Sequence, residues 1–227
     1  MKIDVKNLEK VFRTDSVQTV ALNNVNLTID DGSFVAIMGP SGCGKSTLLN
    51  ILGLLDNPTK GSYRLDGEEV GNLKERERTS WRKGKIGFIF QSFNLIEDMN
   101  IRDNIMLPLN NLDMSKDEKN KRVEETMRRM GISHRSRHYP SQLSGGQQQR
   151  AAIARAIVSR PGLILADEPT GNLDSTNGAE VMAILDELHS EGATIVMVTH
   201  SHKDATHADR IINLFDGQIV DNLNNLM

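Results

Sequence analysis

Hydrophobic and polar positions alternate in two stretches near the start of the chain, residues 2–12 and 20–29. The apolar positions of the second stretch are Val20, Leu22, Val25, Leu27 and Ile29. A period of two turns one face of a strand toward the core and leaves the other in solvent. We therefore expect antiparallel strands that cover one side of the core.

Later apolar runs lack this alternation. They are residues 34–38, 86–90, 161–166 and 193–198, and an amphipathic helix over 177–190 separates the last two. Strands buried on both faces read as continuous apolar runs and belong to parallel sheets with helices on their faces. The pattern predicts an α/β fold with a mostly parallel sheet, closed by a hairpin around Asp216-Gly217.

The composition changes between residues 92 and 137, where a charged stretch over 116–130 carries Val123, Met127 and Met130 on one helical face. This pattern predicts a helical insertion. We place a helical subdomain at approximately residues 92–160, inside a single domain of residues 1–227.

Charge and composition narrow the class of protein. The 227 residues can bury a substantial core, and 27 Lys and Arg against 30 Asp and Glu give a net charge of −3 and no reason to expect nucleic-acid binding. No run reaches membrane-span length and no signal peptide is evident. With a single cysteine, the pattern predicts a cytoplasmic protein that works at a membrane only through another chain.

One basic stretch stands out against this balance. Residues 74–85 hold six basic and two acidic residues around Trp81. They fit either a patch for a partner or lipid headgroups, or a solvated helix face. Both interpretations stay open.

Residues 39–47 read Gly-Pro-Ser-Gly-Cys-Gly-Lys-Ser-Thr, between the apolar strand 34–38 and a helical run from Thr47. This strand, loop and helix match the phosphate-binding loop. Its glycines let backbone N–H groups approach phosphate oxygens, Lys45 would bridge the β- and γ-phosphates, and Ser46 would ligate Mg²⁺. The expected nucleotide-binding residues here are Gly39, Pro40, Ser41, Gly42, Cys43, Gly44, Lys45, Ser46 and Thr47.

Two carboxylates end a later strand, and an aromatic residue precedes a polar loop. Asp167 and Glu168 follow the apolar run 163–166, at the strand end where α/β sheets bind ligands. Asp167 would hold Mg²⁺, and Glu168 would accept a proton from, or orient, the attacking water.

Phe12, just before the loop 13–18, could stack on a base or belong to the core.

A second phosphate-directed feature is Leu143-Ser-Gly-Gly-Gln147, at the start of a helix over 148–157. Ser144 is a typical N-cap residue and the glycines expose backbone amides. A nucleotide has only one γ-phosphate, so two such helix ends in one domain need not converge on it. If two copies met head to tail, each phosphate loop would face the other copy's Ser-Gly-Gly and ATP would be buried between them.

Together these motifs, with Gln91, Asn172-Leu173-Asp174 and His200, resemble the ATP-binding subunit of an ATP-binding cassette (ABC) transporter over essentially the whole chain. The resemblance implies that Phe12 stacks on adenine, that Gln91 senses Mg²⁺ and the attacking water, and that His200 touches the γ-phosphate. It also implies that Asp174 crosses the dimer interface. Residues Ser144, Gly145, Gly146 and Gln147 would belong to the signature that contacts the nucleotide of the opposite subunit.

These roles define one set of expected residues. The catalytic residues would be Glu168, His200, Gln91 and Lys45, and the Mg²⁺ ligands would be Ser46, Gln91 and Asp167. The resemblance implies an Mg²⁺-dependent ATPase that forms a homodimer with ATP and powers an integral membrane permease from the inner face of the membrane.

Local sequences are similar to the branch of macrolide exporters and lipoprotein-releasing systems. Its permeases have few membrane helices, and the work is export, lipoprotein release or mechanical transmission. Asn100 and Asp103 replace a more usual Thr and Glu in the expected permease-docking region, which leaves the partner's identity open. Ser201 stands where Asp often follows the histidine.

Two other functions fit an ABC protein: a soluble clamp that acts on ribosomes or DNA, and a nucleotide-gated scaffold with little turnover. Clamp proteins usually carry two cassettes or a long coiled-coil insertion, and neither is seen in these residues. Scaffolds often lose the catalytic carboxylate, so Glu168 argues against that function. A separate hypothesis is that Cys43 has a lowered thiol pKa, because it lies near a helix N-terminus and Lys45, which both stabilise the thiolate. A tolerated variable position is the alternative for Cys43.

Overall fold

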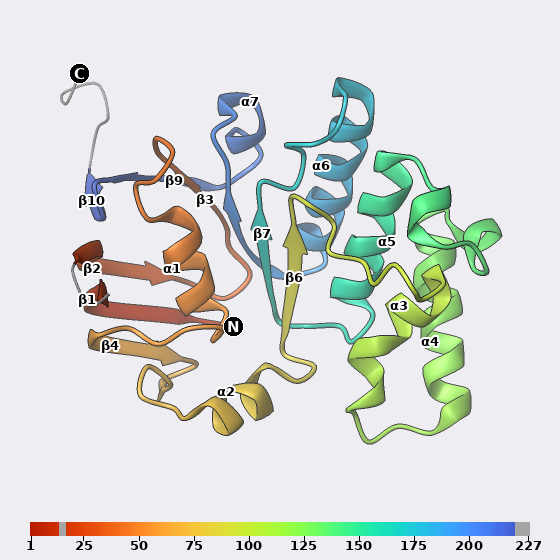
Figure 1. Cartoon of the computed structure of the whole chain (residues 1–227), viewed down its shortest axis with the longest axis horizontal. Helices are drawn as coiled ribbons and strands as arrows, with labels where there is room; N and C mark the ends of the chain where they lie inside the picture. Colours follow the sequence, from red (N-terminus) through yellow and green to blue (C-terminus); the bar gives the residue numbers. More distant parts are fainter. Residues whose placement is uncertain (14–16, 221–227) are drawn as a thin grey trace. The chain divides into compact units, whose positions relative to one another are not determined.

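The computed structural model describes residues 1–13 and 17–220 (Figure 1). The chain divides into two compact units. The first unit holds residues 1–82 and the chain from Leu188 to Val220, and the second unit is Lys83–Glu187. Residues 14–16, in the predicted loop after Phe12, lie outside the described residues.

The first unit begins with an antiparallel sheet in the order β2-β1-β4-β5. Its strands are β1 (Ile3–Arg13), β2 (Gln18–Ile29), β4 (Lys60–Leu65) and β5 (Glu68–Glu69). Ile3 pairs with Ile29 and Val5 with Leu27, and all four side chains are buried. This confirms the predicted alternation from Leu22 onward. At Val20 the prediction is wrong, because that side chain is 51% exposed.

The same unit holds a second group of strands in the order β10-β9-β3-β8. They are β3 (Phe34–Met38), β8 (Thr194–Val198), β9 (Arg210–Phe215) and β10 (Gln218–Val220). Strands β8 and β9 both run parallel to β3, and every residue of β3 and β8 is buried. The predicted hairpin joins β9 to β10, with both Asp216 and Gly217 at positive φ.

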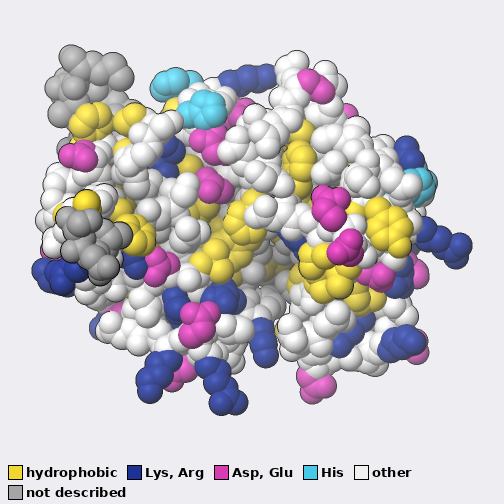
Figure 2. Space-filling model, viewed as in Figure 1, with side chains coloured by type: hydrophobic (Ala, Val, Ile, Leu, Met, Phe, Trp, Pro, Cys, Tyr) yellow, Lys and Arg dark blue, Asp and Glu magenta, His cyan; other side chains and the backbone are white. Residues whose placement is uncertain are grey.

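Three helices belong wholly to the first unit: α1 (Lys45–Leu52), α2 (Glu75–Arg82) and α7 (His202–Ala205). Helix α1 contacts both β2 and β8. Helix α2 carries much of the basic stretch, and Figure 2 shows Lys and Arg side chains gathered at the lower edge, over this helix. Arg78 is nevertheless buried and paired with Glu75, so part of the charge serves the fold.

The second unit combines a parallel strand pair, β6 (Ile86–Phe90) and β7 (Leu163–Asp167), with helices. The helices are α3 (Ile101–Asn110), α4 (Lys116–Arg129), α5 (Gly145–Ile157) and the part of α6 (Ser175–Ser190) up to Glu187, with the 3₁₀ turns η1 (Ser133–Arg135) and η2 (Pro140–Gln142). Helices α3, α4 and α5 contact one another, and Val123, Met127 and Met130 are buried as predicted. These helices lie within residues 92–160, whose bounds as a subdomain stay a prediction.

The α/β class, with parallel strands, an antiparallel sheet and inserted helices, is confirmed. Within residues 1–13 and 17–220, no helix combines the length and the apolar character that a bilayer span requires.

Candidate functional site

The phosphate loop fills the turn from β3 to α1 in the first unit. Lys45 is buried, and its ammonium donates hydrogen bonds to the carbonyls of Gly39 (2.8 Å) and Pro40 (2.9 Å). The lysine therefore folds back over its own loop and sets a positive charge there. With the unpaired amides typical of a helix start, this arrangement suits a polyphosphate.

Neighbouring backbone presses closely on the loop glycines. A Cβ on Gly39 would lie 2.0 Å from the carbonyl oxygen of Leu214, and one on Gly44 would lie 2.4 Å from that of Ala21. Gly217, in the hairpin turn, donates its N–H to the carbonyl of Cys43 at 3.0 Å. Strands β2 and β9 and this turn thus set the loop's shape, and only glycine fits where they touch it.

The remaining residues predicted in the first unit lie at its surface. Ser46 is exposed in the first turn of α1, and Thr47 is half-buried. His200 is exposed just after β8, and β8 runs parallel to β3, which leads into the loop. His200 and the loop therefore leave the sheet at the same strand ends, where this fold class binds ligands.

Phe12 is not part of the core. Its side chain is 46% exposed near the end of β1, and the Lys10 ammonium lies 5.0 Å from the centroid of its ring. An exposed ring supported by a cation is available for stacking on a base. Stacking on adenine stays a prediction, and the core interpretation is wrong.

The two carboxylates lie in the second unit, at the end of β7. Phe90 pairs with Asp167 in the parallel ladder, so Gln91 and Glu168 are the next residues on adjacent strands. Glu168 adopts a left-handed backbone (φ 49°), and its carbonyl accepts a hydrogen bond from the N–H of Gly171 at 3.0 Å. Such strained residues persist where the surrounding structure holds them, often at functional sites.

Gln91 is held by the loop that follows Glu168. Its Nε2 donates to Oδ1 of Asn172 (3.3 Å), and Nδ2 of Asn172 donates to the backbone carbonyl of Gln91 (3.0 Å). A Cβ on Gly171 would lie 2.8 Å from the Gln91 Nε2. The structure thus brings Gln91 together with the loop of the two carboxylates.

The signature turn starts helix α5 with a capping box. The N–H of Gln147 donates to Oγ of Ser144, and the N–H of Ser144 donates to Oε1 of Gln147. Ser144 is exposed, whereas Gly146 is buried against Asn177, whose Oδ1 would lie 1.9 Å from an added Cβ. The predicted N-cap is confirmed, and the exposed turn can meet an anion.

Asp174 precedes α6 and caps it. Its carboxylate accepts hydrogen bonds from the backbone and side-chain amides of Asn177 and from the N–H of Thr176. The backbone bond from Asn177, followed by its side-chain bond, lowers the pKa of Asp174. Asn177 therefore touches both the signature turn and Asp174.

Three residues that hold these motifs have no predicted role of their own. Asn172 and Asn177 fix Gln91 and Asp174, and the buried Gln149 donates to the Pro169 carbonyl at 2.6 Å. The asparagines follow Glu168 closely, as expected of loop-fixing amides. No pattern marked Gln149, which reads as one more polar residue of a helix.

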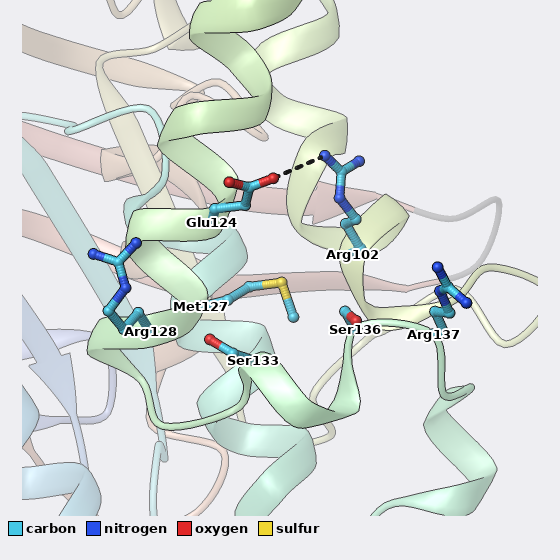
Figure 3. A pocket seen from close by; sticks show the side chains of 7 residues that line it. All are labelled: Arg102, Glu124, Met127, Arg128, Ser133, Ser136 and Arg137. Carbon is cyan, nitrogen blue, oxygen red and sulfur yellow. Dashed lines mark ion pairs between the residues drawn. The ribbon is translucent and has the colours of Figure 1, made fainter.

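A cavity of about 410 Å³ lies elsewhere in the second unit, among α3, α4 and η1 (Figure 3). Arg102 and Glu124 form an ion pair on one side, and Ser133 lies on another. None of the nucleotide motifs contributes a side chain to it. The cavity is therefore separate from the candidate site.

The lowered thiol pKa expected for Cys43 is wrong. The side chain is only 6% exposed, and burial raises its pKa more strongly than the charge of Lys45 lowers it. Burial disfavours the charged thiolate because the interior solvates it poorly.

We therefore expect Cys43 to react slowly with a disulfide reagent at pH 7, with a rate that rises only at alkaline pH. The raised pKa leaves little thiolate at neutral pH, and thiolate is the reacting form. Reaction rates of native and urea-unfolded chain across pH 6–10 test this, and the unfolded chain should react at least about tenfold faster at pH 7. Equal rates at pH 7 would contradict it.

Comparisons with known proteins agree with this geometry. The family model described as ABC transporter matches residues 22–171. An uncharacterized ABC transporter ATP-binding protein of Methanocaldococcus jannaschii is 49% identical over 222 residues, 98% of this chain and 99% of the relative. The macrolide export ATP-binding/permease protein MacB of Chlorobium luteolum is 47% identical over 96% of this chain, which spans only 33% of that relative.

Solved structures support the same assignment. A dimeric ATP-binding cassette in a post-hydrolysis state with ADP and Pi is 45% identical, covers 96% of both chains and has a TM-score of 0.89. The chain therefore belongs to the ABC transporter family and is one of its ATP-binding, ATP-hydrolysing domains.

Proposed function

We propose that two copies of this chain close head to tail around ATP and Mg²⁺, and that closure and hydrolysis drive a membrane permease. One observation carries the dimer: the chain has two anion-binding helix starts, the phosphate loop before α1 and the capped signature turn before α5. One bound nucleotide uses one loop. The exposed Ser144 turn then suits the nucleotide of a second copy, as the dimeric relative supports.

In this proposal Lys45 and the loop amides bind the phosphates, Phe12 stacks on adenine, and the partner copy's signature turn closes the site. Ser46 and Asp167 would hold Mg²⁺ with Gln91, a mixed hydroxyl, carboxylate and amide oxygen set of the kind that this hard cation accepts. The ion would supply charge neutralisation on the phosphates.

Glu168 would accept a proton from the attacking water, with Gln91 orienting that water and His200 contacting the γ-phosphate. The left-handed Glu168 backbone and the Asn172 bonds to Gln91 support this pairing, because both groups are held at the ends of adjacent strands. General base catalysis requires such fixed placement.

The names of the relatives support a permease partner. MacB proteins are named ATP-binding/permease proteins, and this chain spans about a third of their length. We propose that it works with an integral membrane permease at the inner face of the membrane, in export, lipoprotein release or mechanical transmission.

The test is phosphate release from ATP by the purified chain, alone and co-purified with a candidate MacB-type permease. We expect release with Mg²⁺, loss of release when EDTA removes it, and a changed rate with the permease. Release unaffected by EDTA would contradict the metal assignment. ATP binding with no release under any condition would favour the scaffold function instead.

A further inference from the structure

The segment between Gln91 and helix α3 contains a strained turn. Phe93 and Asn94 are consecutive residues with left-handed backbone, φ 60° and 50°, and neither is glycine. Residues with a Cβ avoid this region unless other contacts hold them there. Contacts from outside the turn would therefore stabilise this conformation, most of all at Phe93.

Arg155, on helix α5, makes those contacts. Its guanidinium donates to the backbone carbonyl of Phe93 at 2.9 Å and also to that of Asn94. Burial lowers the pKa of Arg155. Arg155 is partly buried, and its planar guanidinium binds two consecutive carbonyls, which fixes their relative orientation in a way that lysine cannot.

The segment is fixed on both sides of this turn. Before it, Asn172 holds Gln91 by the two bonds described above. After it, the fully buried Asn104 accepts from the N–H of Ile96 (2.7 Å) and donates to the carbonyls of Ile96 and Met99. Of these three anchors, Arg155 is the one on α5, the helix that the signature turn begins.

We propose that Arg155 is a positioning residue for Gln91. From helix α5 it holds the strained turn that follows Gln91, and so ties the position of Gln91 to that of the Ser144 turn. The inference rests on the proposed function, because it assigns Arg155 an effect on hydrolysis through Gln91.

Helix α5 offers a matched control. Arg150 lies five residues before Arg155 and is also partly buried, but it pairs with Glu180 of α6 rather than with the Gln91 segment. Arg150→Lys removes a guanidinium from the same helix but leaves the hydrogen bonds to the Phe93-Asn94 turn in place.

The experiment compares kcat and KM for ATP in Arg155→Lys and Arg150→Lys. We expect Arg155→Lys to lower kcat about ten- to a hundredfold, as small misplacements of catalytic groups do, with KM within about twofold. In a Gln91→Ala background Arg155→Lys should cause no further loss. Asn94→Gly should restore kcat of Arg155→Lys by at least about threefold, because glycine takes the left-handed turn unaided.

Any of three results would overturn the inference: kcat losses that multiply in the Gln91→Ala background, an equal kcat loss in Arg150→Lys, or no rescue by Asn94→Gly. In each case, ATP hydrolysis by the native chain would still support the proposed function. If the native chain does not hydrolyse ATP, the proposed function fails and the inference falls with it. If Arg155→Lys does not fold, the double variant Arg155→Lys/Asn94→Gly should show cooperative unfolding again. A double variant that also fails to fold would overturn the inference.

Discussion

Glu168→Gln is expected to lower kcat for ATP hydrolysis about 10²–10⁴-fold, the usual contribution of a general base, and to leave ATP binding intact. Glutamine has the same shape but cannot accept the proton of the attacking water. The left-handed backbone at Glu168 and its hydrogen bond to Gly171 do not involve the changed atoms, so the loop should keep its form.

Phosphate release and nucleotide binding of the variant measure this effect. Glu68→Gln, an exposed position in β5, is the matched control and should hydrolyse ATP at the native rate. If the Glu168→Gln variant keeps the native kcat, Glu168 is not the general base of this chain.

Gly146→Ala is expected to abolish ATP-dependent association and to lower kcat about 10²-fold. An added Cβ would lie 1.9 Å from Oδ1 and 2.5 Å from Cγ of Asn177, so that side chain must turn away. Turning it breaks the hydrogen bond that Asn177 donates to Asp174 at 2.7 Å. One methyl group thus disturbs both predicted contact points of the dimer.

Light scattering with and without ATP, together with phosphate release, checks this result. Gly178→Ala is the control on the same helix as Asn177, because its Cβ would meet nothing closer than 3.7 Å. We expect it to associate and hydrolyse like the native chain. ATP-dependent dimers of Gly146→Ala would show that the contact with Asn177 is dispensable.

The elements that sequence predicted well are those with strong local signals. The short, continuous apolar runs of β3, β6 and β8 are typical of buried strands, and the Gly-Lys-Ser pattern after β3 indicates a loop and a helix start. The Ser144 cap was equally local, because Ser and Gln three positions apart form a capping box.

What sequence could not predict depends on contacts between distant segments. The pKa of Cys43 is raised because the folded protein buries the thiol, and the residues next to Cys43 in the sequence do not reveal that burial. The sequence predicted Gly217 as part of a hairpin turn, but not that its N–H donates a hydrogen bond to the carbonyl of Cys43. Likewise, nothing local pairs Arg155 with a turn some sixty residues earlier.

In the proposed dimer, each nucleotide site is completed by two copies of the chain. Mixing two inactive variants tests it most directly: Lys45→Ala, which lacks a working phosphate loop, and Ser144→Arg, which lacks a working signature turn. Head-to-tail pairing gives each mixed dimer one intact site, so random pairing predicts about a quarter of the native rate. A mixture of folded variants that stays inactive, or a Ser144→Arg chain that is fully active alone, would contradict the account.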